Sequence, residues 1–443
     1  MELKKYKLGD IAEILISSID KKSKEGESPV RLCNFVDVYH NWAITADMVS
    51  NFMEATTSEK NIDRFSLKKG YVAFTKDSET RDDIGVPTYI AEDLDNTVLG
   101  YHCALVKPDE NIILGKYLNA FLHSDYIKRY FELNATGSGM RYTLSVDTLY
   151  NIPILAPSLD IQKRIGELFS NIDRKICINR SLNHYLEAMA KQLYDYWFVQ
   201  FDFPDANGKP YKSSGGNMIW NEKLKREIPE GWSSEIFSEL CDINKLTLSK
   251  RDNIPTIEYL DTSSITEGIV SETQYLDRHS APSRAQRKVE DLTIVYSCVR
   301  PRLLHYGILC NPPTNFIVST GFATIDAKDK AYSILLYYFL ISCETTEHLG
   351  DIADTAVSSY PAINPSDIGS LRTIVPPRSL SLSFQEKVEV MIREAKRLHL
   401  ENKELEKKRD YLLPLVMTGQ VSVKQLNNDL ASHNIIAIYV LCS

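Results

Sequence analysis

The sequence has no long hydrophobic run, no closely spaced pair of cysteines and no excess of basic charge. No uninterrupted apolar stretch is longer than the one from Ile435 to Cys442, which is far short of the roughly 20 residues that a helix needs to cross a bilayer. The eight cysteines are scattered without a Cys-x-x-Cys motif, which excludes a zinc ribbon and a disulfide framework and fits a reducing compartment. We therefore expect a cytoplasmic protein without a membrane segment.

Signatures of common catalytic and metal sites are also missing. There is no Gly-x-x-x-x-Gly-Lys-[Ser/Thr] loop, and the nine histidines form neither a His-x-x-x-His spacing nor a His/Cys cluster. His102 and Cys103 lie in the strand-like run VLGYHCALV, where neighbouring side chains point to opposite faces, so this pair is expected to be structural. We predict no metal site and no cofactor.

Acidic residues outnumber basic ones. The 51 lysines and arginines against 59 aspartates and glutamates give a net charge of −8, which is the wrong sign for a chain that binds nucleic acid over its whole surface. Any such binding must therefore be local. A length of 443 residues with 43% hydrophobic and 25% charged residues excludes a disordered or fibrous chain and suggests about three domain-sized units.

An internal repeat divides the chain into two similar halves. Residues 141–169 and 359–391 share the order of a polar loop, a short apolar strand, a proline, a glutamine and a long helix. A duplication explains this shared order better than chance. The fold is therefore expected to consist of two similar units. The matching positions are Tyr142 and Tyr360, Asp147 and Asp367, Ile154 and Ile374, Pro157 and Pro377, and Gln162 and Gln385.

Two long helices with coiled-coil periodicity follow the repeated proline. On a strict seven-residue repeat, nine of eleven a and d positions from Ile161 are apolar, as are eight of ten from Phe384. Asn179 and Asn402 each occupy an a position near the middle of a helix. A buried asparagine fixes register when a polar partner lies opposite, so we expect these two to face one another across antiparallel helices. The alternative is two surface asparagines on separate amphipathic helices.

The first helix is long enough to act as a spacer. About 38 residues from Ile161 to Phe198 make a helix of roughly 57 Å, against about 34–36 Å for one turn of DNA. Such a spacer suits two patches on one face of a duplex. Pro414 is expected to end or kink the second helix, because proline removes a backbone donor and clashes one turn back.

A connector lies between the first helix and the second globular part of the chain. Residues 200–232 are rich in proline, glycine and serine, as linkers are. The aromatic residues in this segment predict that it packs against another part of the chain. They are Phe201, Phe203, Tyr211, Trp220 and Trp232.

The connector FDFP…GKPYKSSGG…W…IPEGW and the ending YLLPLVMTGQVSV resemble the specificity subunits of type I restriction-modification systems. The resemblance covers residues 1–424 in order. It implies that two target recognition domains each read one half of a bipartite double-stranded DNA target. It further implies that the helices and the connector hold two methyltransferase subunits, onto which a restriction and translocase subunit docks. On this resemblance the chain is not an enzyme, since the chemistry belongs to the partner subunits.

The expected fold is α+β. Two mixed α/β target recognition domains are separated by a long antiparallel two-helix coiled coil and related by a pseudo-twofold internal repeat. The last residues, 425–443, have no counterpart in the family. The expected division is 1–157 for the first target recognition domain, 158–198 for the first spacer helix, 199–232 for the connector, 233–377 for the second target recognition domain, 378–420 for the second spacer helix and 421–443 for the tail.

Two rival functions stay open. ATGSGM (135–140) resembles the glycine loop of amino-methyltransferases and NPPT (311–314) their Asn-Pro-Pro-aromatic motif, so a self-sufficient adenine methyltransferase is one alternative. Against it, the glycines follow a helical pattern rather than a strand, and Thr314 cannot stack on a flipped base. The other alternative is a coiled-coil scaffold that binds only protein, which the net charge of −8 favours.

Local polar and cationic clusters are the candidates for DNA contact. Arginine, lysine and hydroxyl side chains read base edges and phosphates, and glycine permits close approach of the backbone. The clusters recur at matching places in the two repeats, although a cation cluster in a loop is often only a solvated surface. The candidates are Lys76, Arg81, Gly137, Ser138, Arg141 and Tyr142 in the first domain, and Arg284, Arg287, Lys288, Arg300, Arg302, His305, Tyr306, Ser358, Ser359 and Tyr360 in the second.

Overall fold

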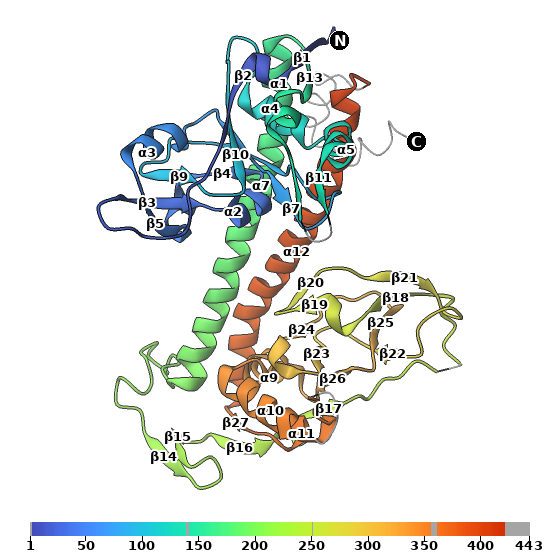
Figure 1. Ribbon diagram of the computed structural model, residues 1–443. Coiled ribbons are helices and arrows are strands. Elements are labelled where there is room, and N and C mark those ends of the chain that lie inside the picture. The colour runs from blue at the N-terminus through green and yellow to red at the C-terminus, as the bar shows by residue number, and fades with distance from the viewer. Residues whose placement is uncertain (1, 139–140, 250, 356–360, 421–443) are drawn as a thin grey trace. The chain divides into compact units, whose positions relative to one another are not determined.

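The computed structural model of the chain contains helices and strands in mixed order (Figure 1). It describes residues 2–138, 141–249, 251–355 and 361–420. The mixture of long helices with short strands is the α+β composition that the sequence predicts.

The chain divides into two compact units. Unit 1 is Met1–Asn179 together with Glu401–Ser443, and unit 2 is Arg180–Leu400. Both boundaries fall inside long helices, α7 (Leu159–Tyr194) and α12 (Arg378–Met417). Each unit therefore combines one mixed domain with a stretch of both helices.

Unit 1 is built on a five-stranded sheet and a three-stranded sheet. The larger sheet has the strand order β2-β10-β6-β8-β4, and the smaller has the order β5-β3-β9. The bounds of the elements up to β10 are β1 (Lys4–Lys7), α1 (Leu8–Ile11), β2 (Ala12–Ile16), β3 (Ser28–Cys33), α2 (Phe35–His40), β4 (Ala43–Ile44), a 3-10 helix (Ala46–Asn51), β5 (Met53–Thr57), α3 (Glu59–Phe65), β6 (Val72–Thr75), β7 (Asp77–Ser78), β8 (Pro87–Ile90), β9 (Thr97–Leu99) and β10 (Cys103–Pro108). They continue with α4 (Gly115–Leu122), α5 (Asp125–Asn134), β11 (Thr136–Ser138), β12 (Arg141–Thr143), α6 (Val146–Tyr150) and β13 (Pro153–Ala156).

The central strand β6 separates two hydrophobic clusters because side chains alternate across a strand. Val72 and Phe74 are buried in one cluster and Ala73 in the other. The neighbouring strand β10 alternates in the same way, with Ala104 in the first cluster and Leu105 in the second. Both faces of the sheet are therefore covered, which explains the consecutive apolar residues Val72 to Phe74 in β6 and Cys103 to Val106 in β10.

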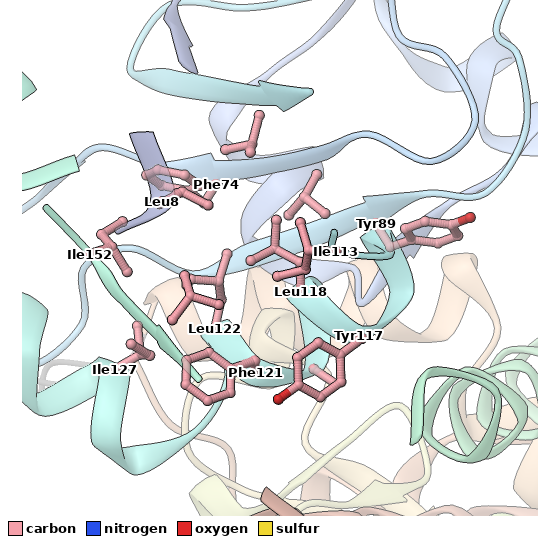
Figure 2. Close-up of a cluster of buried hydrophobic side chains, with 14 of the residues drawn as sticks. Leu8, Phe74, Tyr89, Ile113, Tyr117, Leu118, Phe121, Leu122, Ile127 and Ile152 are labelled. Atoms are coloured by element: carbon pink, nitrogen blue, oxygen red, sulfur yellow. The ribbon is translucent and has the colours of Figure 1, made fainter. Parts of the chain in front are cut away.

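Helix α4 covers one face of this sheet (Figure 2). Leu118, Phe121 and Leu122 lie in the same buried cluster as Phe74 of β6. The helix begins at Gly115, where a Cβ atom would lie 2.0 Å from the carbonyl oxygen of Gly70. Glycine is needed at this position because any larger residue would push the helix away from the sheet.

Unit 2 is built on two four-stranded sheets, with the strand orders β17-β26-β23-β24 and β21-β18-β25-β22. The bounds up to β22 are β14 (Met218–Asn221), β15 (Arg226–Pro229), β16 (Ser233–Ile236), α8 (Phe237–Leu240), β17 (Cys241–Ile243), β18 (Thr256–Leu260), a 3-10 helix (Thr262–Ser264), β19 (Ile265–Thr266), β20 (Ile269–Val270), β21 (Gln274–Asp277) and β22 (Ala285–Lys288). They continue with β23 (Ile294–Ser297), a 3-10 helix (Pro301–Leu303), β24 (Tyr306–Ile308), β25 (Phe316–Ser319), β26 (Phe322–Ala327), a 3-10 helix (Lys330–Tyr332), α9 (Ser333–Leu340), α10 (Cys343–Thr355), α11 (Pro365–Ser370) and β27 (Arg372–Val375).

Strand pairing shows the repeat more clearly than the sequence does. The order β17-β26-β23-β24 in unit 2 corresponds to β2-β10-β6-β8 in unit 1. The parallel pair β18 and β25 corresponds to β3 and β9, and the pair β16 and β27 to β1 and β13. The predicted internal repeat is therefore a duplication of a whole domain topology.

The two long helices run antiparallel within each unit. In unit 1, Nδ2 of Asn179 donates to Oδ1 of Asn402 at 2.9 Å and to Oε2 of Glu401 at 3.1 Å. Nδ2 of Asn402 donates in turn to the carbonyl oxygen of Ile176 at 3.4 Å. Both asparagines are buried, so the two do face one another, and the alternative of separate surface positions does not hold.

In unit 2 an aromatic cluster joins the end of α7 to the start of α12. Helix α7 gives way to a π-helical turn at Asp195–Val199. The ring of Phe384 in α12 lies 4.8 Å from that of Phe198 and 5.8 Å from that of Trp197 between centroids. Trp232, at the end of the connector, packs against Phe198 at 5.9 Å. The connector is thereby anchored on the helices.

The aromatic residues of the connector do not all pack. Phe203 stacks on Tyr211 with ring centroids 4.7 Å apart and on Trp232 at 5.1 Å, and Phe201 is buried. Trp220 is 56% exposed on β14, so the expectation that it packs against the rest of the chain is wrong. Its indole N–H donates to Glu222 at 3.0 Å, which keeps the polar edge paired at the surface.

Pro414 does not end the second helix. α12 continues through this residue to Met417. Leu413, Val416 and Met417 are buried in the core of unit 1, so packing of the last turn offsets the one backbone hydrogen bond that proline removes.

A buried histidine in unit 1 predicts a measurable loss of stability in acid. The ring of His123 stacks on that of Trp42 at 4.0 Å, and the guanidinium of Arg409 lies 5.3 Å from the Trp42 centroid. Burial, together with the positive charges of Arg409 and Lys128, lowers the pKa of His123 from 6.5 to about 3. His123 is therefore neutral in the folded state at pH values where the unfolded chain binds a proton.

We expect the free energy of unfolding to fall as the pH drops below 6.5, with a slope from this group that approaches about 1.4 kcal/mol per pH unit. The stability is complete above 6.5 and is lost toward pH 3, because only the unfolded state gains the proton. His123→Phe keeps the stack on Trp42 and cannot titrate. Urea unfolding at pH 6.5 and 5 should show a loss about 2 kcal/mol smaller in the variant; equal losses would contradict the assignment.

Candidate DNA interface

A small sheet gathers the unit 1 candidates at one place. β12 pairs antiparallel with β11 on one side and with β7 on the other. Gly137 in β11 has a φ of 143°, and a Cβ atom there would lie 2.2 Å from the carbonyl oxygen of Arg141. Only glycine fits this close approach of two backbones. The sheet thus brings residues 77–78, 136–138 and 141–143 together.

Asp77 is the centre of a group of polar side chains on this sheet. Nζ of Lys76 donates to Oδ1 of Asp77 and to Oγ1 of Thr143, both at 3.1 Å. Nδ1 of His102 lies 2.5 Å from Oδ2 of Asp77. Nη2 of Arg141 lies 3.4 Å from the same oxygen and 2.6 Å from Nδ1 of His102. We call these five residues the Asp77 cluster.

The carboxyl group of Asp77 stays ionised in this setting. Burial raises its pKa, but hydrogen bonds from Thr143, His102 and Lys76 outweigh burial and lower the pKa from 3.8 to about 2. Its side chain is 10% exposed, whereas that of Arg141 is 59% exposed. A mostly buried anion therefore holds a cation whose far end faces solvent.

An open pocket adjoins the Asp77 cluster. Phe35 and Tyr39 of α2 stack along one side with centroids 5.7 Å apart, and Arg81 lies 5.0 Å over the ring of Tyr142 nearby. Arginine can bind phosphates and base edges, and a carboxylate can accept a hydrogen bond from the amino group of cytosine. The lining consists of Phe35, Tyr39, Asp77, Ser78, Glu79, Thr80, Asp83, His102 and Arg141.

Unit 2 repeats the backbone pairing that forms this site, and we call this shared pairing the backbone frame. Val299 pairs with Ala362, and the amide of Arg300 donates to the carbonyl oxygen of Pro361 at 2.9 Å, as β7 pairs with β12 in unit 1. The amide of Cys298 donates to Gly321 at 2.9 Å. In unit 1 the amide of Lys76 donates to His102 at 2.8 Å, so Cys298 and Gly321 correspond to Lys76 and His102.

Different side chains stand on this second frame. Arg300 has a φ of 47° and leads into the short 3-10 helix at Pro301–Leu303. Nη2 of Arg302 lies 2.6 Å from Oδ1 of Asp351, and its Nε lies 3.5 Å from Asp354, both on α10. Both arginine side chains of this loop lie at the surface. The unit 2 site therefore presents guanidinium groups where unit 1 presents a lysine, a histidine and an arginine.

A second group of unit 2 candidates lies on β22 and just before it. Arg284 is exposed, and its carbonyl oxygen accepts from the amide of Thr320 at 2.8 Å, next to the Gly321 turn. Nζ of Lys288 lies 2.8 Å from Asp252, and Nη1 of Arg287 donates to Thr247 at 3.3 Å. The backbone of Arg284 is thus bonded next to Gly321, while the side chains of Arg287 and Lys288 have polar partners of their own.

Comparison with known proteins identifies the family. A family model described as the type I restriction modification DNA specificity domain matches residues 1–188. The specificity subunit of the HindI type I restriction enzyme of Haemophilus influenzae is 23% identical over 94% of this chain and 99% of its own. The family model and the full-length relative together indicate a type I restriction-modification specificity subunit.

Other relatives agree with this assignment. The MjaIX specificity subunit of Methanocaldococcus jannaschii is 22% identical over 71% of each chain. The crystal structure of a type I S subunit from M. genitalium aligns with a TM-score of 0.60 over 94% of this chain and 96% of that one, at 14% identity, which shows a common fold. Two mixed domains with a coiled-coil linker are therefore the architecture of this specificity subunit, and neither rival function finds support.

Tyr306 has to be withdrawn from the DNA candidates of the specificity subunit. Its ring is buried against Tyr296 at 6.0 Å and Tyr337 at 6.4 Å, so it has no surface to offer. His305 stays at the surface, but its Nδ1 lies 2.7 Å from the carbonyl oxygen of Ile265. The alternation of a strand explains the error, since Tyr306 begins β24 and points into the core.

Two residues of the unit 1 site escape sequence reasoning. His102 does not lie in a continuous strand: β9 ends at Leu99, β10 begins at Cys103, and His102 has a φ of 72° in the turn between them. The turn aims His102 at Asp77 instead of placing it opposite Cys103. Gly100, just before it, was the available signal for a turn. Asp77 gives no signal of its own in the sequence, because a carboxylate repels phosphate and is not expected at a DNA surface.

Some candidates lie outside the described residues. Ser358, Ser359 and Tyr360 fall in the stretch 356–360. Ser138 is described through its backbone, which pairs with Arg141. Within the described part of the chain, no group of three or more His, Cys, Asp or Glu side chains is suited to a metal ion, and no helix is long and apolar enough to cross a membrane.

Proposed function

We propose that this specificity subunit directs a type I restriction-modification complex to a bipartite site in double-stranded DNA, with each unit reading one half. The chain then has no catalytic role of its own, and methylation and cleavage belong to partner subunits. We infer that it acts in the cytoplasm, where the DNA target is found.

One observation carries this proposal. The two units share a backbone frame, in which the segment after the central strand pairs with the segment before the last short helix and strand. The side chains on this frame differ between the two units. A repeated frame with unlike contact residues suits a target whose two halves differ in sequence. The overall charge of −8 restricts DNA binding to such local sites.

The proposed DNA contacts are the candidates that lie at the surface of these two frames. In unit 1 they are Lys76, Arg81, Arg141 and Tyr142, with Gly137 and Ser138 supplying backbone. In unit 2 they are Arg284, Arg300, Arg302 and His305. Arg287 and Lys288 are proposed as weaker contacts because each already has a polar partner within the unit.

We further propose that α7, α12 and the connector hold two methyltransferase subunits, and that a restriction and translocase subunit docks onto that complex. The domains of this arrangement are 1–157 and 233–377 for DNA, 158–198 and 378–420 for the spacer helices, 199–232 for the connector and 421–443 for a tail. The Asn179 and Asn402 pair is proposed to set the register of the spacer helices.

A map of modified adenines tests the proposal. Genomic DNA is exposed to the full chain together with its methyltransferase partner and then read for methylated adenines. We expect every site to consist of two short defined blocks on either side of a gap of fixed length and undefined sequence. A single continuous motif would contradict the two-unit assignment.

A second measurement addresses the protein-binding scaffold. The complex should protect DNA of the mapped sequence at salt concentrations where it releases unrelated DNA, because base contacts persist after phosphate contacts are screened. The methyltransferase without this chain is the control. Equal binding to both DNA sequences would leave the chain with a scaffold role only.

A further inference from the structure

The Asp77 cluster contains an anion in a place where a DNA-binding surface is expected to carry cations. We propose that Asp77 is a positioning residue, which holds the Lys76 ammonium, the His102 ring and the Arg141 guanidinium as one unit for reading the DNA half-site of unit 1. This inference rests on the proposed function and names the residue that sets selectivity in one of its two sites.

The geometry favours a positioning role for Asp77 over a direct contact with DNA. Its side chain is 10% exposed, against 17% for Lys76, 31% for His102 and 59% for Arg141. Exposure thus increases outward from the carboxylate through its partners. The groups available to a ligand are the outer faces of His102 and Arg141, and their positions are fixed from within by one carboxylate.

Three segments that are far apart in sequence depend on this carboxylate. Lys76 and Asp77 follow β6, His102 lies in the turn between β9 and β10, and Arg141 begins β12. Lysine and arginine side chains lose considerable rotamer freedom when they are fixed. If they are fixed before DNA arrives, that loss does not weaken binding, and a wrong base meets donors that cannot move to accommodate it.

Unit 2 has no equivalent of this arrangement on its described frame. The position that corresponds to Asp77 is Val299, and the position of His102 is Gly321. Arg302 instead pairs with Asp351 and Asp354 on α10, which are 75% and 56% exposed. A substitution at Asp77 should therefore affect one half-site and leave the other intact, which provides an internal control.

Because Asp77 is negatively charged, its substitution is expected to change general DNA binding and half-site selection in opposite directions. A carboxylate beside DNA repels phosphate, so its removal alone should strengthen binding to DNA of any sequence. If Asp77 positions the cations, the same change should weaken selection of the correct half-site. Stronger general binding combined with poorer selection is a signature that simple loss of structure does not produce.

The test uses the full chain in complex with its methyltransferase partner. Methylation rates are compared for DNA with both half-sites correct, with the unit 1 half changed, and with the unit 2 half changed. In Asp77→Asn we expect selection at the unit 1 half to fall at least tenfold and selection at the unit 2 half to stay within twofold. Binding to unrelated DNA should be equal to or tighter than that of the wild type.

Two further variants make the result decisive. Glu13→Gln makes the same change of charge in unit 1 at the opposite end of β10, where Glu13 pairs with Lys107 at 3.3 Å, and it should leave both selections unchanged. Thr143→Val removes the hydroxyl that accepts from Lys76 without a change of charge. It should lower selection at the unit 1 half by about threefold, and it tests the proposal even if Asp77→Asn does not fold.

The outcomes separate this inference from the proposed function. Unchanged selection at the unit 1 half in a folded Asp77→Asn or Thr143→Val variant would overturn the positioning role. Equal loss at both halves in a folded variant would overturn it as well, because the effect would then not belong to one site. A wild-type complex without two selected blocks would instead overturn the proposed function itself.

Discussion

A chain that carries Arg300→Gln and Arg302→Gln is expected to lose recognition of the unit 2 half-site while it still selects the half read by unit 1. A good base contact by arginine discriminates by about 1–3 kcal/mol, so the selection at one half should fall by roughly 10- to 100-fold. If one of the two arginines contacts phosphate instead, binding should weaken on DNA of every sequence. The slope of the logarithm of the binding constant against the logarithm of the salt concentration should then become shallower by about one. Methylation of DNA with each half changed in turn measures this.

The matched control for this prediction is Arg378→Gln. Arg378 lies 2.6 Å from Asp329 and is 62% exposed, and Arg302 lies 2.6 Å from Asp351 and is 49% exposed. The changes at Arg302 and Arg378 both remove exposed ion pairs, two at Arg302 and one at Arg378. Exposed ion pairs contribute little to stability, and Arg378 lies outside the candidate clusters. Loss of both half-sites in the double variant would indicate misfolding, and loss in Arg378→Gln would indicate a general effect of charge.

Substitution of one buried asparagine should be more harmful than substitution of both. Asn402→Leu removes one of the two acceptors of the Asn179 amide, Oδ1 of Asn402, and leaves it with Glu401 in the buried helix interface, at an expected cost of about 1–3 kcal/mol. In the double variant Asn179→Leu, Asn402→Leu, apolar packing replaces the pair, and most of this loss should return. The free energies of unfolding of the wild type, both single variants and the double variant form the measurement.

The same variants separate stability from specificity of pairing. The double variant is expected to be stable but to lose the polar contact that favours one register of α7 against α12. Additive effects of the two single variants would mean that the asparagines do not act as a pair. Leu398→Ala, a buried position of α12 four residues away, is the control for a general loss of packing between the helices.

The long helices were predictable because they depend on a pattern that is local in sequence. The heptad repeat alone gives a helix near Leu159–Tyr194 and another near Arg378–Met417. The asparagine contact follows from the same repeat, because an a position faces the partner helix. The continuation past Pro414 was not predictable, since it depends on core residues of unit 1 that lie far away in sequence.

The candidate sites were predictable only in part. Cations after a central strand, such as Lys76 and Arg300, are visible in sequence, and the repeat supports them. The role of His102 depends on a turn that interrupts an apolar run, and the burial of Tyr306 depends on which way one short strand faces. In both cases the direction of the side chain depends on the backbone at a single position. Periodicity measured over a longer window does not reveal such a direction.

The assignment of both ends of the chain to unit 1 has a consequence for synthesis. Leu412, Leu413, Val416 and Met417 complete a core whose other members, such as Leu168 and Phe169, are made some 240 residues earlier. On the ribosome the first domain therefore waits with an uncovered apolar surface until the last helix emerges, whereas unit 2 can close as soon as Leu400 is free. A nascent chain that stops after unit 2 would leave that surface uncovered, and only molecules that extend through Met417 would bury it.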